Sequence, residues 1–127
     1  MQNLKYVGKN LFVEKLSIKN ILKKNKKINL NETYKIGEAK INLNKMSIEL
    51  QKKINKINNA EKKILIEMLA NPGKTYSREQ IKEISNISQE RSIDVMITRL
   101  RQKIELNPKN PKYLQTIRGS GYVLWVE

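Results

Sequence analysis

The feature that most constrains the fold is a change of hydrophobic period near residue 58. Between Tyr34 and Ile57, apolar residues alternate with polar ones in short runs, YKIG, AKINL, MSIEL and QKKINKI, which Gly, Asn and Lys interrupt. A period of two predicts short β-strands, and hence a small antiparallel meander. Because one small sheet cannot bury its own apolar face, helices must cover it.

Two capped helices are expected directly after the sheet. Asn58 is a good N-cap, with Glu61 three residues later, and the Asn-Pro-Gly of residues 71–73 ends the first helix. Ser77 caps a second, shorter helix that runs through Ser85. A brief turn then leads into a longer helix.

The longer helix, expected from about residue 89 to 106, has only one apolar face. Ile93, Ile97, Leu100 and Ile104 recur at the spacing of a buried stripe. At about 100° per residue, six side chains lie on the opposite side of the helix. These are Arg91, Ser92, Val95, Thr98, Arg99 and Gln102. Lys and Glu, the usual solvating residues, are absent from this face.

The chain closes with two β-rich runs, YLQTI and YVLWV, separated by the four residues RGSG. Glycine permits the positive φ of tight turns, so this segment predicts a β-hairpin with Arg118 at its tip. An arginine at a narrow turn suits a DNA minor groove, whereas the simpler alternative is a solvated turn residue. Tyr122 and Trp125 are expected mainly to pack within the core or hairpin, with base stacking as the alternative.

The charge of the chain indicates a polyanionic partner. The net charge is +14, from 26 basic and 12 acidic residues, which suits nucleic acid or an anionic membrane surface. Lys, Ile and Asn make up 53 of the 127 residues, a bias typical of AT-rich genomes, so the lysines are weak evidence. The arginines are more informative, because all five lie in the last 50 residues: Arg78, Arg91, Arg99, Arg101 and Arg118.

Several function classes are excluded. The sequence has no Cys and no His, which removes disulfides, thiolate metal sites, cysteine nucleophiles and a histidine general base. We therefore expect no cofactor, no metal and no enzymatic activity. No apolar run approaches the roughly 18 residues of a membrane span, and the N-terminus lacks the apolar region of a signal peptide. These patterns predict a cytoplasmic protein that does not bind membranes.

Two short helices followed by a longer one with a polar outer face are typical of a helix-turn-helix, whose longer helix enters a major groove. Arg91 and Arg99 suit guanine edges or phosphates. The hydroxyls of Ser92 and Thr98 suit phosphate oxygens, and Val95 suits a thymine methyl. The simpler alternative is an ordinary solvated helix surface.

Arg101 lies on a flank of the same helix, two turns after Asp94. We expect it to make an intrahelical or phosphate contact before any base contact.

The segments SREQI, ERSIDVMITRLRQKIE and YLQTIRGSGYVL, together and in this order, resemble the winged-helix effector domain of OmpR/PhoB-type response regulators. The resemblance covers about residues 34–126. It implies an α+β fold: a winged helix-turn-helix with an N-terminal four-stranded antiparallel sheet, a three-helix core and a C-terminal β-hairpin wing. It also implies that helix 89–106 lies in the major groove and that wing 113–126 reaches the neighbouring minor groove or backbone.

The DNA-contacting positions of the family correspond to nine residues here: Arg91, Ser92, Val95, Met96, Arg99, Arg101, Thr116, Arg118 and Gly119. Thr98 stands where the family often has a basic residue, which removes one phosphate contact. Thr98, Gln102 and Tyr122 complete the set of candidate DNA-binding residues. The family further implies an RNA polymerase contact through the loop Asn86–Gln89, and a homodimer on tandem half-sites.

Residues 1–30 depart from the family pattern. They read as a helix (residues 11–24) and a linker, loosely similar to the end of a receiver domain, whereas residues 31–127 form the winged-helix domain. The only aspartate is Asp94, so a phosphoacceptor pocket is absent and phosphorylation is not expected in this chain. We expect either a standalone effector domain or the remaining end of a decayed gene. The apolar side chains of residues 11–24 would then either pair with a partner such as a second copy or stay loosely ordered.

Two functions from different classes remain open. The first is a sequence-specific regulator of transcription that binds double-stranded DNA. The second is a non-specific basic protein that coats nucleic acid or an anionic surface through its lysines. Arg99→Ala and Arg118→Ala should abolish sequence preference under the first hypothesis, whereas only the number of lysines should matter under the second. An enzymatic function has no constellation of residues to support it.

Overall fold

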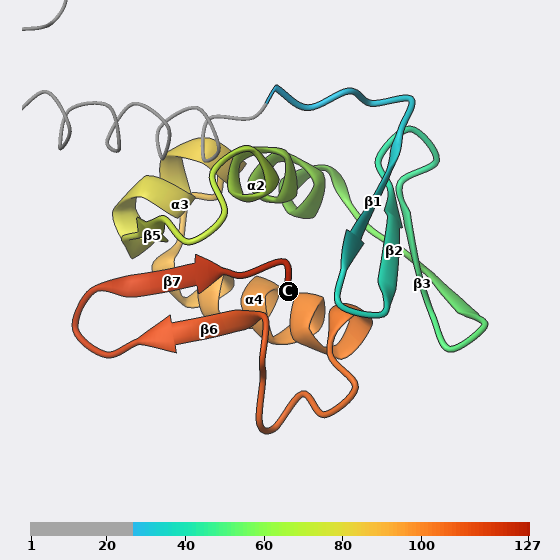
Figure 1. Ribbon diagram of the computed structural model, residues 1–127. Helices are drawn as coiled ribbons and strands as arrows, with labels where there is room; N and C mark the ends of the chain where they lie inside the picture. The colour runs from blue at the N-terminus through green and yellow to red at the C-terminus, as the bar shows by residue number, and fades with distance from the viewer. Residues whose placement is uncertain (1–26) are drawn as a thin grey trace, which may run out of the picture.

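The computed structural model describes residues 27–127, so the helix expected over residues 11–24 lies outside the described part. The elements in chain order are β1 (Thr33–Ile36), β2 (Ala39–Asn42), β3 (Ser47–Leu50), β4 (Lys53–Lys56), α2 (Asn59–Ala70), β5 (Thr75–Tyr76), α3 (Arg78–Ser85), α4 (Glu90–Ile104), β6 (Leu114–Ile117) and β7 (Gly121–Leu124). Figure 1 shows the first four strands at one end of the molecule and the hairpin β6–β7 lying against α4.

The N-terminal sheet is the meander that the period of two predicts. Its strands are antiparallel in the order β1-β2-β3-β4. Ile41 pairs with Ile48 across β2 and β3, and Ile36 pairs with Ala39 across β1 and β2. All four side chains are fully buried, and β3 contacts α4. Alternation therefore directs one face of the sheet onto the helices, as expected.

Both predicted capping boxes are present. The side chain of Asn58 accepts from the backbone N–H of Glu61 at 2.8 Å, and Glu61 accepts from that of Asn58 at 2.9 Å. Ser77 and Gln80 make the same reciprocal pair at the start of α3, at 3.1 and 2.8 Å. Asn86, in the left-handed conformation with φ of 58°, ends α3. Each cap satisfies backbone groups that a helix end leaves unpaired.

The core stripe of α4 is confirmed. Ile93, Ile97, Leu100 and Ile104 are each no more than 1 % exposed. The helix is one or two residues shorter at each end than the expected 89–106, a difference within the usual uncertainty of helix ends. Its end is set by the buried Glu105, which leaves the helical conformation one residue past α4.

The wing has one strand more than the sequence predicts. β5 pairs with β7, so the second sheet has the order β5-β7-β6, and Tyr76 lies opposite Tyr122. The hairpin loop has three residues rather than four, because Gly121 pairs with Ile117. A two-residue strand has no hydrophobic period of its own and is specified by its partner β7.

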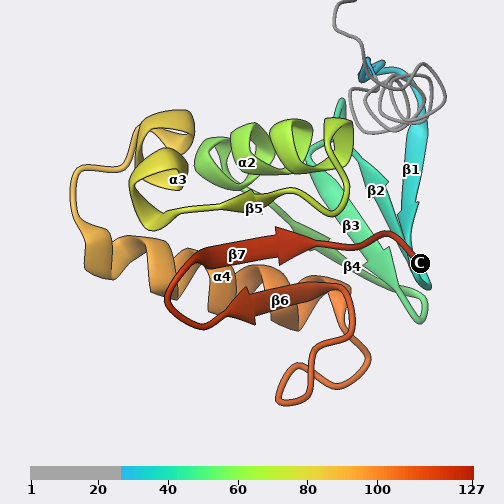
Figure 2. The same ribbon diagram turned by 60° about the vertical axis from the view of Figure 1, so that its left-hand side comes forward.

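The segment after β7 links the two sheets. Gly37 donates its backbone N–H to the carbonyl of Val126 at 3.0 Å, and Gly73 donates to that of Leu124 at 2.9 Å. Trp125 is 43 % exposed, and its ring lies against Gly73. It therefore packs on the turn between α2 and β5 rather than in the core. Figure 2 shows the C-terminus beside the first sheet. Within residues 27–127, no helix is long and apolar enough to cross a membrane.

Candidate nucleic-acid interface

The outward face of α4 is accessible as the helical geometry predicts. Arg91, Thr98, Arg99 and Gln102 are exposed, and Ser92 is half-buried. A groove of about 300 Å³ follows this face, between α4 and the start of α2. The residues that line it are Asn58, Ala60, Glu61, Ile87, Arg91, Ser92, Val95, Met96 and Arg99. The structure thus brings five of the predicted DNA-binding residues to one groove.

Met96 differs from the other residues of this groove. It is 5 % exposed and belongs to the hydrophobic core, whereas Val95 beside it is 42 % exposed. Met96 lies at the edge of the buried stripe of α4, where the elements packed around the helix cover it. Its burial argues against Met96 as a base-contacting side chain and leaves Val95 as the apolar contact of this face.

The five arginines fall into two groups. Arg91, Arg99 and Arg118 are exposed, and none of the hydrogen bonds or ion pairs within residues 27–127 involves their guanidinium groups. Arg78 and Arg101 bind other residues of the protein. Three guanidinium groups, two on α4 and one on the wing, are therefore available to an anionic partner.

Arg101 donates its hydrogen bonds to the wing and not to Asp94. Its Nε donates to the carbonyl of Leu114 at 2.8 Å, and its Nη2 donates to Oγ1 of Thr116 at 2.7 Å. The guanidinium also lies 5.8 Å from the centre of the Tyr122 ring, within reach of a cation–π interaction. The expected intrahelical contact with Asp94 is corrected, because β6 supplies acceptors that the sequence could not place. Two candidate DNA-binding residues, Arg101 and Thr116, contact each other.

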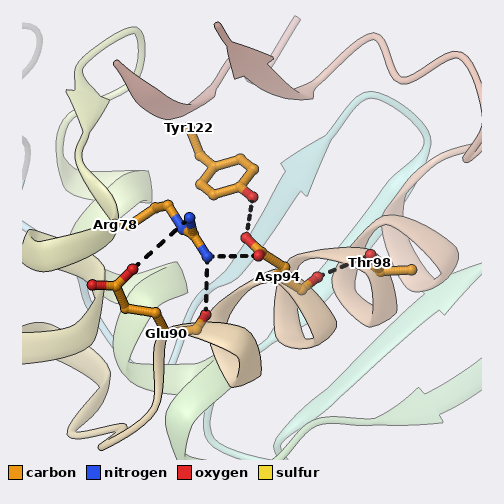
Figure 3. Close-up of polar contacts among 5 residues, drawn as sticks. All are labelled: Arg78, Glu90, Asp94, Thr98 and Tyr122. Carbon is orange, nitrogen blue, oxygen red and sulfur yellow. Dashed lines mark hydrogen bonds and ion pairs between the residues drawn. The ribbon is translucent and has the colours of Figure 1, made fainter. Parts of the chain in front are cut away.

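Asp94 joins three elements (Figure 3). Arg78 at the start of α3 donates to Oδ2 of Asp94 at 2.7 Å, and Tyr122 of β7 donates to Oδ1 at 2.7 Å. Arg78 also donates to the backbone carbonyl of Glu90 at 3.4 Å. Thr98 donates its hydroxyl to the carbonyl of Asp94 at 2.9 Å, one helical turn away. This hydroxyl therefore already has an acceptor in its own helix.

Tyr122 is a buried hydrogen-bond donor. It is 9 % exposed, which confirms the expectation that it packs within the fold. Burial raises the pKa of its phenol to about 12, and the hydrogen bond and the charge of Asp94 act in the same direction. The phenol is thus neutral at ordinary pH and keeps the proton that it donates to Asp94.

The tip of the wing is exposed. Arg118 and Gly119 lie on the surface, and Gly119 has φ of +80°, as the third position of a type II turn requires. Ile117 beside them is 38 % exposed and is an apolar side chain at the tip that was not among the predicted site residues. A cleft of about 550 Å³ separates this tip from the starts of α3 and α4. Strand alternation next to a turn was the available signal for Ile117.

The described residues offer no metal site. Among residues 27–127, no group of three or more His, Cys, Asp or Glu side chains could hold a metal ion.

The sequence did not predict the contacts of Arg78, since Asp94 lies 16 positions away and no local pattern joins the two residues.

An antiparallel sheet, a helix-turn-helix and a C-terminal hairpin against the longer helix define a winged-helix protein. The chain belongs to the family of transcriptional regulatory proteins, C-terminal domain, whose match covers residues 51–124.

Two relatives with curated descriptions match in this region. The regulatory protein VirG of Agrobacterium tumefaciens is 41 % identical over 71 residues, which are 53 % of this chain and 27 % of VirG. Protein PetR of Rhodobacter capsulatus is 63 % identical over 35 residues, 28 % of this chain and 15 % of PetR. The chain thus spans less than a third of the length of these relatives.

Solved structures agree with the family. The response regulator DrrB, an OmpR/PhoB homologue of Thermotoga maritima, has a TM-score of 0.65 at 28 % identity, covering 95 % of this chain and 55 % of DrrB. The effector domain of BfmR from Acinetobacter baumannii has a TM-score of 0.61 at 33 % identity, covering 79 % and 95 %. The DNA-binding domain of AdeR, solved in complex with an intercistronic region, has a TM-score of 0.56 at 25 % identity, covering 71 % and 96 %. The resemblance to the winged-helix domain of OmpR/PhoB-type response regulators is confirmed.

Proposed function

We propose that this chain is a sequence-specific, double-stranded DNA-binding regulator of transcription of the two-component response-regulator type. The observation that carries the proposal is a set of three exposed guanidinium groups, on α4 and the wing, that have no hydrogen-bond or ion-pair partner among residues 27–127. α4 would lie in the major groove, and the wing at the neighbouring minor groove or backbone. The AdeR domain, of the same fold, was solved bound to an intercistronic region, which supports a DNA ligand.

The residues of α4 have different proposed roles. Arg99 and Arg91 would bind guanine edges or phosphates through two N–H groups at once. Val95 would contact a thymine methyl, and Ser92 and Gln102 would donate to phosphate oxygens or base edges. These roles follow from exposure and chemistry along one face of the helix.

At the wing, Arg118 would enter the minor groove, where the negative potential is greatest. Gly119 would bring the backbone close to the sugar–phosphate chain, since nothing lies within 4 Å of a Cβ built on it. Arg101, Thr116 and Tyr122 would mainly hold the wing in place, because their polar groups bind one another or Asp94.

We propose four further features. The winged-helix domain would begin near residue 31, after an N-terminal segment of residues 1–30. Two copies would bind tandem half-sites, because one such module buries little surface. The loop Asn86–Gln89 would contact RNA polymerase. A DNA target would place this activity in the cytoplasm.

We propose no phosphorylation site within these 127 residues. The only aspartate, Asp94, lies on α4, and both its carboxylate oxygens accept hydrogen bonds from the protein. Among residues 27–127, no cluster of acidic side chains surrounds Asp94 that could hold a metal ion beside a phosphoacceptor.

The test is selection of binding sites from random duplex DNA at near-physiological salt. We expect the wild type to enrich a short motif and Arg99→Ala to lose it. Arg99→Lys keeps the charge but cannot bind a guanine through two N–H groups, so it should bind DNA without the original preference. Lys35→Ala, which removes one exposed charge from the outer face of the first sheet, is the control and should keep the motif.

Two outcomes would contradict the proposal. If the wild type binds every duplex at low salt and enriches nothing, the chain is a non-specific basic protein. If Lys35→Ala weakens the motif as much as Arg99→Ala does, total charge rather than base readout governs binding.

A further inference from the structure

The carboxylate of Asp94 is held from two sides by parts of the chain that are distant in sequence. Arg78 contacts one oxygen and Tyr122, 28 positions away, contacts the other, each at 2.7 Å (Figure 3). The side chain of Asp94 is 49 % exposed and that of Arg78 is 44 % exposed. Ion pairs this exposed contribute little to the free energy of unfolding. The cluster therefore matters for the orientation of the elements that it joins, more than for stability.

An aspartate on a helix that faces DNA is unfavourable unless its charge is balanced, because phosphates repel it. Here the guanidinium of Arg78 lies 2.7 Å from Asp94 and offsets its charge, while also pairing with the carboxylate of Glu90 at 3.9 Å. The neutral phenol of Tyr122 satisfies the remaining oxygen of Asp94. The carboxylate thereby acts as an acceptor that joins α4 to β7.

A second attachment lies two turns further along α4. Arg101 donates to Leu114 and Thr116 of β6, and residues 94 and 101 lie on the same side of the helix at a spacing of seven. The pairing of β5 with β7 holds one edge of the hairpin, and these two side-chain attachments, one to each strand of the hairpin, tie it to α4 itself. The β6–β7 ladder between them is continuous from Leu114 to Ile117.

We infer that Asp94 is a positioning residue: through the hydroxyl of Tyr122 it sets the orientation of the wing on α4, and so makes the DNA contact of Arg118 effective. This inference rests on the proposed function. Binding groups must be held to within about 0.5 Å by supporting hydrogen bonds, and Arg118 lies at the exposed end of the hairpin that these two attachments hold.

The chain supplies a matched control. Tyr76 lies opposite Tyr122 in the same sheet, is buried, and donates its hydroxyl to a carboxylate, Glu67, at 3.1 Å. Burial raises its pKa to about 12 as well. Its hydroxyl binds α2 rather than α4, so Tyr76→Phe removes the same kind of hydrogen bond without releasing the wing from the recognition helix.

The first test is a double-mutant cycle on the selected duplex. In the wild type and in Tyr76→Phe, we expect Arg118→Ala to weaken binding about five- to tenfold, and in Tyr122→Phe less than about twofold, because contacts that share a support are not additive. The loss caused by Arg99→Ala should be equal in all three backgrounds. An Arg118→Ala loss that is unchanged by Tyr122→Phe would overturn the inference, since a purely structural role changes only the melting temperature.

The second test needs no DNA. Residual dipolar couplings of the free protein should fit α4 and the wing as one rigid body in the wild type and in Tyr76→Phe, but not in Tyr122→Phe or Asp94→Ala. If the couplings of Tyr122→Phe still fit one body, Asp94 does not set the wing. If the wild type selects no DNA motif, the proposed function fails, while these couplings still decide the geometry.

Discussion

At the scale of the residue, arginine has two different roles in this protein. Arg78 and Arg101 bind carboxylate, hydroxyl and carbonyl oxygens within the fold. Arg99 and Arg118 are exposed and have no such partners in the part of the chain that the structure describes. The difference arises from the acceptors that each arginine meets. It separates arginines that shape the interface from arginines that can bind DNA.

Glu105 shows how one buried side chain can determine a loop. It is 3 % exposed, and its two oxygens accept the backbone N–H groups of Lys112 at 2.9 Å, Tyr113 at 2.9 Å and Leu114 at 2.7 Å. The carboxylate thus accepts backbone N–H groups that would otherwise need carbonyl partners, in the segment that leads into the wing.

We expect Glu105→Ala to lower the free energy of unfolding by about 3 kcal/mol or more, because it leaves three backbone donors without their acceptor. Urea denaturation measures this loss. Glu38→Ala, in an exposed turn of the first sheet, is the control and should change it by less than about 0.5 kcal/mol. A loss from Glu105→Ala as small as that of the control would show that water replaces the carboxylate.

At the scale of the element, the wing depends on a close approach between β5 and β7. A Cβ at Gly121 would lie 1.9 Å from the carbonyl oxygen of Tyr76, and φ of Gly121 is +139°. Gly119 also has a positive φ, +80°, but nothing lies within 4 Å of its would-be Cβ. The two glycines are therefore required for different reasons: one for space and conformation, the other for conformation alone.

Gly121→Ala should cost about 3 kcal/mol or more, because β5 and β7 must separate to admit the methyl group. Gly119→Ala should cost only about 1 kcal/mol, the price of a left-handed conformation at a turn. Thermal unfolding of the two variants makes the comparison. Equal losses would mean that the hairpin shifts as a unit and relieves the contact with Tyr76.

At the scale of the whole molecule, the net charge of +14 exceeds what the interface uses. Many lysines lie on surfaces away from α4, such as Lys35 and Lys40 on the outer face of the first sheet. Under the proposed function, charge on such surfaces would attract DNA at long range, and ions would screen it over about 8–10 Å at physiological salt.

The salt dependence of binding distinguishes these charges from direct contacts. If about five phosphates are neutralised, the logarithm of the association constant should fall with that of salt concentration at a slope of about −4 to −5. Arg118→Ala should reduce the magnitude of this slope by about 1, and Lys35→Ala should leave it unchanged. A slope that responds equally to both variants would favour the non-specific basic protein.

The sequence by itself determined the elements of this protein other than β5, because their signals are local. Asn58 and Ser77 cap their helices within three residues, the alternation through Ile41 and Ile48 marks the sheet, and the stripe from Ile93 to Ile104 marks the face of α4 that enters the core. Propensity, capping and period act within a few residues of the chain.

Only the tertiary structure decided which residues of the interface meet. β5 exists because β7 lies beside it, and Met96 is buried because of the elements packed around α4. Asp94 meets Arg78 and Tyr122 across 16 and 28 positions. Contacts this distant in sequence leave no local pattern, since folding alone brings their atoms together. These contacts separate the arginines that bind within the fold from those that face outward.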